Sequence, residues 1–164
     1  MNDATPTSRT LHFQSDSPED TADLAKRIAA VVSPGTTIAL IGTLGVGKTY
    51  FSRAFAAACG IPEEQVVSPT FVICHQHESP KFRINHLDVY RLSGGDEFVD
   101  LGAEEMMESE SVQLIEWADQ VADYLPDERL EIEFQVTGEN SRTITVTAYG
   151  HALAQKLKEL EPLS

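Results

Sequence analysis

The sequence predicts an α/β fold in three layers, with helices on both faces of a mixed sheet and an antiparallel hairpin near its C-terminal end. Three observations lead to this prediction. A glycine-rich loop lies between a short apolar run and a helical pattern. Helical patterns and short apolar runs alternate through most of the chain, which is typical of a sheet covered by helices. Two segments with strict apolar–polar alternation, 130–136 and 144–148, predict the hairpin.

The elements before the loop are an edge strand, a helix and a buried strand. Residues 9–13 predict a short edge strand. Ser17 is expected to cap the following helix, because Pro18 suits its first turn and acidic residues suit its positive end. Apolar residues at helical spacing continue that helix to Val32, and the apolar run 37–41 is the strand that enters the loop.

Helices and strands continue to alternate after the loop. In order they are a helix over 49–59, an extended segment over 66–76, a strand over 82–89, an acidic helical region over 97–108, a strand over 112–115, the hairpin and a final helix over 152–160. We expect one domain covering residues 1–164, with residues 1–8 loosely ordered. In such sheets ligands bind at the carboxyl ends of the parallel strands, so residues just past the strand ends are candidates for chemistry.

Residues 42–49 form a complete G-x-x-x-x-G-K-T phosphate-binding loop. Its glycines let backbone amides face phosphate oxygens, and the dipole of the following helix favours an anion. Lys48 is expected to reach the β- and γ-phosphates, and Thr49 to offer its hydroxyl to Mg²⁺. The sequence therefore predicts a nucleotide-binding protein with a P-loop NTPase-like fold. The nucleotide-binding residues expected in this stretch are Gly42, Thr43, Leu44, Gly45, Val46, Gly47, Lys48, Thr49 and Tyr50.

Two acidic residues follow apolar strands and are candidates for catalysis. Asp88 ends one strand and Glu116 ends the next. A phosphate-loop enzyme needs an acid to hold Mg²⁺ or its waters and a group to orient the attacking water. The sequence does not say which acid does which. Thr70, in the loop 68–71, is placed like a switch residue that senses the γ-phosphate, although Ser-Pro-Thr is also an ordinary turn.

The chain is acidic, with 12 Lys and Arg against 26 Asp and Glu in 164 residues and a formal net charge of −14. It therefore lacks the basic surface expected of a protein that grips DNA, RNA or an anionic membrane by itself. Cys59 and Cys74 are expected to be reduced thiols. No apolar run approaches membrane length and no leader begins the chain. We expect a soluble, cytoplasmic protein.

The motifs together resemble a known family. In order stand the phosphate loop, S-P-T-F at 68–71, H-L-D-V-Y-R-L at 86–92, L-G at 101–102 and L-I-E-W at 114–117. This succession resembles the bacterial TsaE (YjeE) ATPases, which take part in tRNA threonylcarbamoyladenosine biosynthesis. The resemblance spans roughly residues 17–150. It departs at Thr43, where the family usually has Asp, at Leu87, where Phe is common, and near His77, where a Tyr is common.

The resemblance implies a role for each matching position. ATP or ADP and Mg²⁺ are the implied cofactors, with Lys48 and the loop backbone on the phosphates. Thr49 and Glu116 are implied as the Mg²⁺-linked pair, with Asp88 and Thr70 completing the catalytic or switching shell. The metal-linked candidates are thus Thr49, Glu116 and Asp88. Trp117 is expected near the site, and Ser17, Thr21 and Arg142 are expected to flank the adenine or ribose.

The resemblance also implies an accessory ATPase rather than the enzyme that modifies tRNA. The transfer step belongs to a TsaB–TsaD pair in that family, so tRNA is expected to be met only indirectly through that complex. Intrinsic hydrolysis is expected to be slow, because the chain has no obvious arginine finger. Arg91 is the nearby candidate, and such an arginine could equally come from a partner.

Two other functions are open at this stage. A small-molecule kinase would carry an arginine-rich lid, but residues 94–110 contain no Arg or Lys. A non-hydrolytic module would use ATP only to organise a partner interface. His75 and His77 share a strand face and could suggest a metal, but no third ligand stands at metal spacing. The acids of residues 96–110 are read as a solvated helical face, with partner contact as the second reading.

Overall fold

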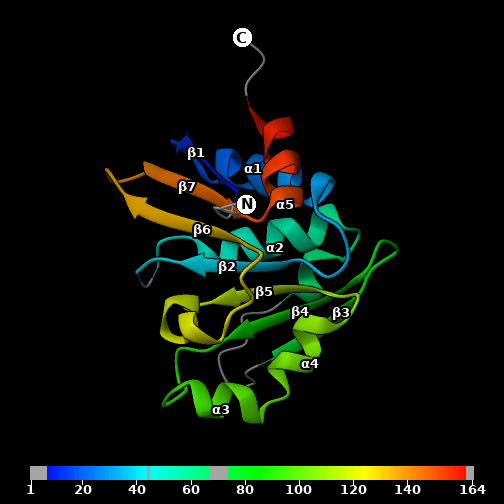
Figure 1. Ribbon diagram of the computed structural model, residues 1–164. Helices are drawn as coiled ribbons and strands as arrows, with labels where there is room; N and C mark the ends of the chain where they lie inside the picture. The colour runs from blue at the N-terminus through cyan, green and yellow to red at the C-terminus, as the bar shows by residue number, and fades with distance from the viewer. Residues whose placement is uncertain (1–6, 44, 67–73, 162–164) are drawn as a thin grey trace, which may run out of the picture.

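The computed structural model describes residues 7–43, 45–66 and 74–161. A seven-stranded sheet runs through them in the order β1-β7-β6-β2-β5-β4-β3 (Figure 1). The strands are β1 (Ser8–Ser15), β2 (Thr37–Ile41), β3 (Cys74–Glu78), β4 (Arg83–Asp88), β5 (Val112–Glu116), β6 (Arg129–Val136) and β7 (Arg142–Tyr149). The α-helices are α1 (Pro18–Val31), α2 (Lys48–Ala58), α3 (Gly95–Asp100), α4 (Ala103–Glu108) and α5 (His151–Leu157), and the 3₁₀ helices are η1 (Glu63–Gln65), η2 (Ala118–Tyr124) and η3 (Lys158–Leu160).

The sheet is mixed, which confirms the predicted α/β class. Strands β6, β2, β5 and β4 are parallel neighbours, so their carboxyl ends lie along the same edge. The C-terminal hairpin β6–β7 is inserted between β2 and the antiparallel edge strand β1. At the opposite edge β3 pairs antiparallel with β4. In Figure 1 the arrowheads of β2, β5 and β4 all lie on the left, which is the edge that carries the candidate site.

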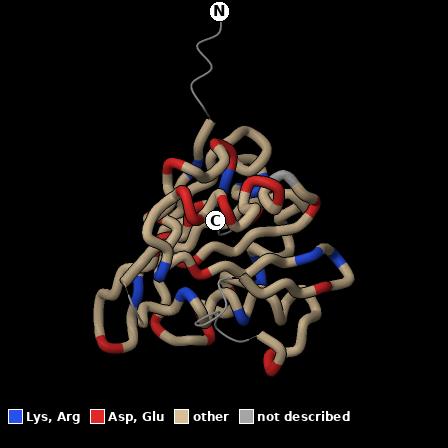
Figure 2. The backbone as a smooth tube through the Cα atoms, turned by 90° about the horizontal axis from the view of Figure 1, so that it is seen from below, with Lys and Arg blue, Asp and Glu red and all other residues tan. Residues whose placement is uncertain are grey.

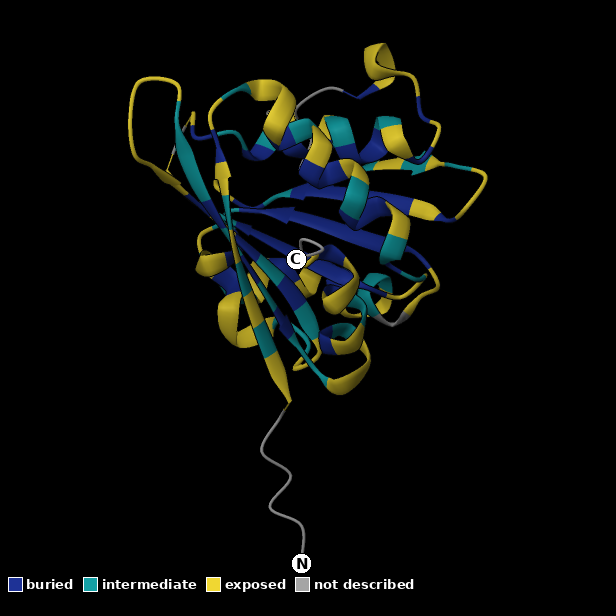
Figure 3. Ribbon diagram, turned by 90° about the horizontal axis from the view of Figure 1, so that it is seen from above, coloured by how far each residue is buried: buried dark blue, intermediate teal, exposed yellow. Residues whose placement is uncertain are grey.

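Each face of the sheet buries its own apolar core, because side chains alternate along a strand. In β2, Ile38 and Leu40 join the core under α1, α2 and α5, whereas Ala39 joins a smaller core under α3, α4 and η2. Figure 3 shows the central strands as buried over most of their length. Burying one such Ile or Leu contributes about 1.5–3 kcal/mol. The parallel centre of the sheet is therefore the rigid support on which the site stands.

The helix α1 begins as the sequence predicts. The Ser17 hydroxyl accepts a hydrogen bond from the Asp20 amide at 3.2 Å, and Pro18 occupies the first turn. Leu24 and Ile28 lie on its buried face. An N-cap of this type stabilises a helix by about 1 kcal/mol.

Two local features differ from the predicted pattern. The acidic region is broken into α3 and α4 at Gly102, which has φ of 80°, a left-handed conformation that glycine adopts without strain. After β5, Trp117 is also left-handed, with φ of 62°, and turns the chain into η2. Of the expected extended segment 66–76, residues 67–73 lie outside the described ranges, and Cys74–Glu78 form β3. No helix in the described ranges has both the length and the apolar character needed to cross a membrane.

Candidate active site

The phosphate loop is fixed to the core by the side chain of Val46. Val46 is buried in the core, and its side chain lies so close to Gly42 that a Cβ there would meet Val46 Cγ1 at 2.7 Å. Gly42 must therefore be glycine for the loop to close over Val46. Gly47 has φ of 120° and leads directly into α2, whose first residue is Lys48. The loop thus delivers the amino end of an eleven-residue helix to the carboxyl edge of the sheet.

Lys48 is folded back onto its own loop. Its ammonium donates to the carbonyl oxygen of Gly42 and, at 2.9 Å, to that of Thr43. The same Nζ lies 3.9 Å from the ring centroid of Trp117, a cation–π contact. Burial lowers the pKa of Lys48, against the raising effects of Glu116, Asp119 and Asp88. The lysine charge is held by two loop carbonyls and an aromatic ring.

Thr49 and Glu116 are directly hydrogen-bonded. Thr49 Oγ1 donates to Glu116 Oε1 at 2.8 Å, joining the first turn of α2 to the end of β5. Glu116 is only 2% exposed. The two side chains that were expected to share a Mg²⁺ ion are therefore placed together by adjacent parallel strands.

Asp88 stands beside Glu116 at the end of the neighbouring strand. The two residues are Cα partners in the parallel pairing of β4 with β5. Asp88 Oδ1 accepts a hydrogen bond from the Tyr90 amide at 2.9 Å, so this carboxylate caps its own turn. Burial raises the pKa of Asp88, and the nearby Glu116 charge adds to that rise, whereas the bond from Tyr90 opposes it. The structure brings both predicted acids to the loop but gives them different surroundings.

His86 is a site residue whose contact the sequence did not predict. Its Nε2 is hydrogen-bonded to Glu116 Oε2, and His86 is 1% exposed. His86 lies two residues before Asp88 on β4, so the two side chains share a face of the sheet. The two-residue spacing of His86 and Asp88 is visible in the sequence. The register of β4 against β5, which places His86 diagonally across from Glu116, is not.

Arg142 is brought to the phosphate loop from the far end of the chain. It begins β7, and its Nε donates to the carbonyl oxygen of Val46. The same Nε lies 3.7 Å from where a Cβ on Gly47 would stand. Ser17 acts as the cap of α1, and the Thr21 hydroxyl is hydrogen-bonded to Ser15 Oγ at 2.8 Å. Contact of these three residues with a nucleotide stays a prediction.

Aromatic and acidic side chains border the loop. Trp117 stacks at a tilt on Tyr90, with 4.8 Å between the ring centroids, and Tyr90 is 55% exposed. Tyr50, directly after Thr49, is also exposed. Asp119, at the start of η2, is close enough for its charge to raise the pKa of Lys48. Asp119 was not predicted as a site residue, although it follows Glu116 by only three residues.

Two predicted site residues, Leu44 and Thr70, lie outside the described residues. Within the described ranges, no three His, Cys, Asp or Glu side chains are grouped to hold a metal ion. His75 and His77 stack with 6.3 Å between their ring centroids. The oxygens of Thr49 and Glu116 are the donor type that Mg²⁺ prefers, and Mg²⁺ is usually bound by one or two protein oxygens together with substrate phosphates and waters. The residues present fit that ion.

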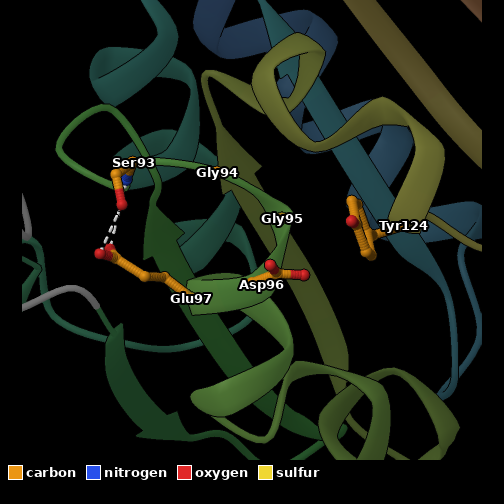
Figure 4. A pocket seen from close by; sticks show the side chains of 6 residues that line it. All are labelled: Ser93, Gly94, Gly95, Asp96, Glu97 and Tyr124. Atoms are coloured by element: carbon orange, nitrogen blue, oxygen red, sulfur yellow. Dashed lines mark hydrogen bonds between the residues drawn. The ribbon is translucent and has the colours of Figure 1, made fainter.

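A small cavity of about 170 Å³ lies between the start of α3 and the end of η2 (Figure 4). It is lined by Ser93, Gly94, Gly95, Asp96, Glu97 and Tyr124. Figure 4 shows Glu97 turned toward Ser93, whose hydroxyl donates to it at 2.6 Å, while Tyr124 faces Gly95 from the other wall. A Cβ on Gly95 would meet Tyr124 Cε2 at 1.7 Å, so the close approach of α3 to η2 requires glycine there.

A second hollow of about 300 Å³ lies at the amino end of β4, near Lys81, Arg83 and Glu110. It is remote from the loop because Arg83 begins β4 whereas Asp88 ends it. Acidic positions are spread over many separate stretches of the chain (Figure 2). The negative charge is therefore general rather than confined to the site.

Comparisons of this chain with a protein-family model, with known sequences and with solved structures all point to one family. Residues 15–144 match the family described as threonylcarbamoyl adenosine biosynthesis protein TsaE. The tRNA threonylcarbamoyladenosine biosynthesis protein TsaE of Bacillus subtilis is 39% identical over 150 residues, which cover 92% of this chain and 93% of that protein. The protein of the same name from Treponema pallidum is 36% identical over 130 residues, covering 79% and 95% of the two chains. The crystal structure of Bacillus subtilis YdiB superposes with a TM-score of 0.80 at 34% identity, covering 94% of this chain and 95% of that one.

Proposed function

Because the chain belongs to the TsaE family, we propose that it is a Mg²⁺-dependent ATPase that serves as an accessory subunit in the biosynthesis of N6-threonylcarbamoyladenosine in bacterial tRNA. The proposal rests on one observation above all. The hydrogen bond from Thr49 to Glu116 joins the first turn after a phosphate loop to a buried strand-end acid. This is the arrangement that phosphate-loop ATPases use to bind Mg²⁺-ATP.

The chain's own groups account for binding of the phosphates. The amides at the start of α2 and the helix dipole favour an anion at the loop. Lys48 needs to exchange the carbonyl oxygens of Gly42 and Thr43 for phosphate oxygens, which carry more negative charge. Since burial lowers the pKa of Lys48, its charge is undersolvated and gains more from a phosphate than an exposed lysine would.

Thr49 and Glu116 are the residues that would hold Mg²⁺ in this proposal. Bound there, the ion would neutralise charge on the phosphate oxygens. Asp88 lies next to Glu116 and has its carboxylate held by one backbone amide, so it is the acid available to orient a water. An additional cation for the transferring phosphoryl group would come from Arg91, or from a partner.

A protein partner fits the chemistry of the chain better than direct contact with RNA. The formal net charge of −14 repels a phosphate backbone. The same negative charge would attract a protein partner with a basic face. We therefore propose that the chain acts in the cytoplasm on a TsaB–TsaD-type complex and meets tRNA through that complex.

Phosphate release from ATP, measured for the purified chain alone and with a TsaB–TsaD pair, tests this function. We expect slow release alone and faster release with the pair, together with formation of threonylcarbamoyladenosine on tRNA. Lys48→Ala should abolish both signals. Transfer of phosphate to a small acceptor faster than to water would show a kinase instead. Turnover that stays at background with partners, while Lys48→Ala still abolishes the modification, would show a non-hydrolytic module.

A further inference from the structure

The carboxylate of Glu116 is held from two sides. Thr49 Oγ1 donates to Oε1 at 2.8 Å, and His86 Nε2 is hydrogen-bonded to Oε2. Glu116 is 2% exposed and His86 is 1% exposed, so the bond between these two side chains is shielded from water, whereas Thr49 is half-buried. Each carboxylate oxygen of Glu116 therefore makes one hydrogen bond, Oε1 with the phosphate-loop helix α2 and Oε2 with the neighbouring strand β4.

We propose that His86 is a positioning residue that orients the Glu116 carboxylate toward Thr49 and the metal-nucleotide. This inference rests on the proposed ATPase function of the same site. Among the described residues, the hydrogen bond made by the His86 side chain goes to Glu116 and not to the phosphate loop. His86 acts by setting the rotation of the carboxylate plane, which decides where Oε1 points.

The direction of the hydrogen bond follows from the chemistry of the acceptor. An ionised carboxylate can only accept, so Nε2 of His86 is the nitrogen that carries the proton. The other nitrogen, Nδ1, is buried and has no hydrogen-bond partner among the described residues. The hydrogen bond that the His86 ring makes is therefore the one to Glu116.

The ring of His86 is held by packing and strand position. On β4 its Cα partners are Leu114 of β5 and His75 of β3, and strands lie on both sides of it. Glu116 lies two residues beyond Leu114 on the same face of β5. A donor on a strand that is paired on both sides can therefore fix the acid with little freedom of its own, which is what supporting residues around a metal site require.

The proposal is tested by a pair of substitutions with a matched control. His86→Gln keeps an N–H near the position of Nε2, whereas His86→Leu removes the donor at similar size. His75→Gln removes the imidazole of the Cα partner of His86 on β3. Calorimetric titration with ADP, with and without Mg²⁺, measures how much the ion improves nucleotide affinity. Phosphate release in the presence of the partner pair gives the second readout.

We expect His86→Leu to lose about 10-fold or more of both the Mg²⁺-dependent gain in affinity and the turnover, which is typical of groups that support metal ligands. ADP affinity without Mg²⁺ should change less than about twofold, because the phosphate loop is untouched. His86→Gln should recover most of the loss, and His75→Gln should match the wild type. A folded His86→Leu chain with the full Mg²⁺ gain, or a His86→Gln chain as impaired as His86→Leu, would overturn the proposal.

A double substitution keeps the test valid if His86→Leu alone fails to fold. In the Glu116→Gln background the acid is already gone. Adding His86→Asn, whose amide is too short to replace Nε2, should then cost no further activity if His86 acts through Glu116, although His86→Asn alone lowers turnover. Fully additive losses would overturn the positioning role. Failure of the ATPase proposal looks different, because then the wild-type chain itself shows neither a Mg²⁺ gain nor turnover with partners.

Discussion

The ends of β5 and β4 carry one acid each in direct register, yet the two acids differ in burial and in their hydrogen-bond partners. Glu116 on β5 is buried and has both oxygens hydrogen-bonded to other elements. Asp88 on β4 is partly exposed and is bonded to the amide of Tyr90, two residues along its own turn. Glu116 is thus preorganised before any ligand arrives, whereas Asp88 can adjust to one. Position at a strand end alone does not decide an acid's role.

The difference follows from where the strands lie. Strand β5 has β2 on one side and β4 on the other, so its end faces the phosphate-loop helix. Strand β4 lies one place further out, next to the edge strand β3. The central acid therefore gains partners from α2 and β4, and the outer acid turns to its own backbone.

Turnover should separate the two acids most strongly. Glu116→Gln is expected to lower partner-stimulated phosphate release by about 100-fold or more, because the metal-linked group is removed while shape is kept. Asp88→Asn should cost about 10-fold, because Asn can still accept from Tyr90 and contact a water. Single-turnover assays at saturating ATP measure both, with calorimetry to check that nucleotide binding is kept. A larger loss in Asp88→Asn would reverse the assignment.

Stability should separate them in the same direction. Glu116→Ala leaves the buried His86 Nε2 and the half-buried Thr49 Oγ1 without their acceptor, and a buried donor that loses its partner costs about 1–3 kcal/mol. Asp88→Ala gives up one hydrogen bond at a partly exposed position, worth about 1 kcal/mol. Urea denaturation followed by circular dichroism measures the two free energies of unfolding. Equal losses would show that Glu116 is no better supported than Asp88.

The pH dependence of stability is a smaller effect that belongs to Asp88. Because burial raises the pKa of Asp88 in the folded chain, the folded state holds this proton more tightly than the unfolded state. Stability from this group is therefore present below its ordinary pKa of 3.8 and lost as pH rises through the raised pKa. The difference in unfolding free energy between Asp88→Asn and wild type should shift in favour of the variant as pH rises through that window. A pH-independent difference would contradict the raised pKa.

The smallest expected effect is on the lysine that both acids face. The charge of Glu116 raises the pKa of Lys48 more than that of Asp88 does. Nucleotide affinity should fall as pH rises through the pKa of Lys48, and Glu116→Gln should move this fall to lower pH further than Asp88→Asn. Titrations of ADP without Mg²⁺ at alkaline pH measure the shift. An equal shift in both variants would mean that the acids are equivalent for Lys48.

The sequence was sufficient where chemistry depends on residues close together along the chain. The loop, its lysine and threonine, and the cap of α1 at Ser17 all follow from local pattern. The meeting of Thr49 with Glu116 was also predictable, because parallel strands bring their carboxyl ends to one edge. The bond from His86 to Glu116 was not, since it depends on the register of β4 against β5. A one-residue slip would turn His86 to the other face.

Arg142 illustrates the same limit over a longer span. The sequence placed it near a nucleotide only through the family resemblance. Its contact with Val46 exists because the hairpin β6–β7 is inserted beside β2, which sets residue 142 against residue 46. The break at Gly102 had a visible signal, since a glycine inside a helical pattern is a common end point. The left-handed Trp117 had none, because tryptophan rarely adopts that conformation.

That left-handed turn at Trp117 gives the chain a built-in optical reporter. Trp117 is the single tryptophan of the chain, and its ring lies 3.9 Å from the Lys48 ammonium and next to Tyr90. If the ammonium exchanged the indole for a phosphate, the electric field on the chromophore would change. Emission from the unlabelled protein would then report the position of Lys48 in real time.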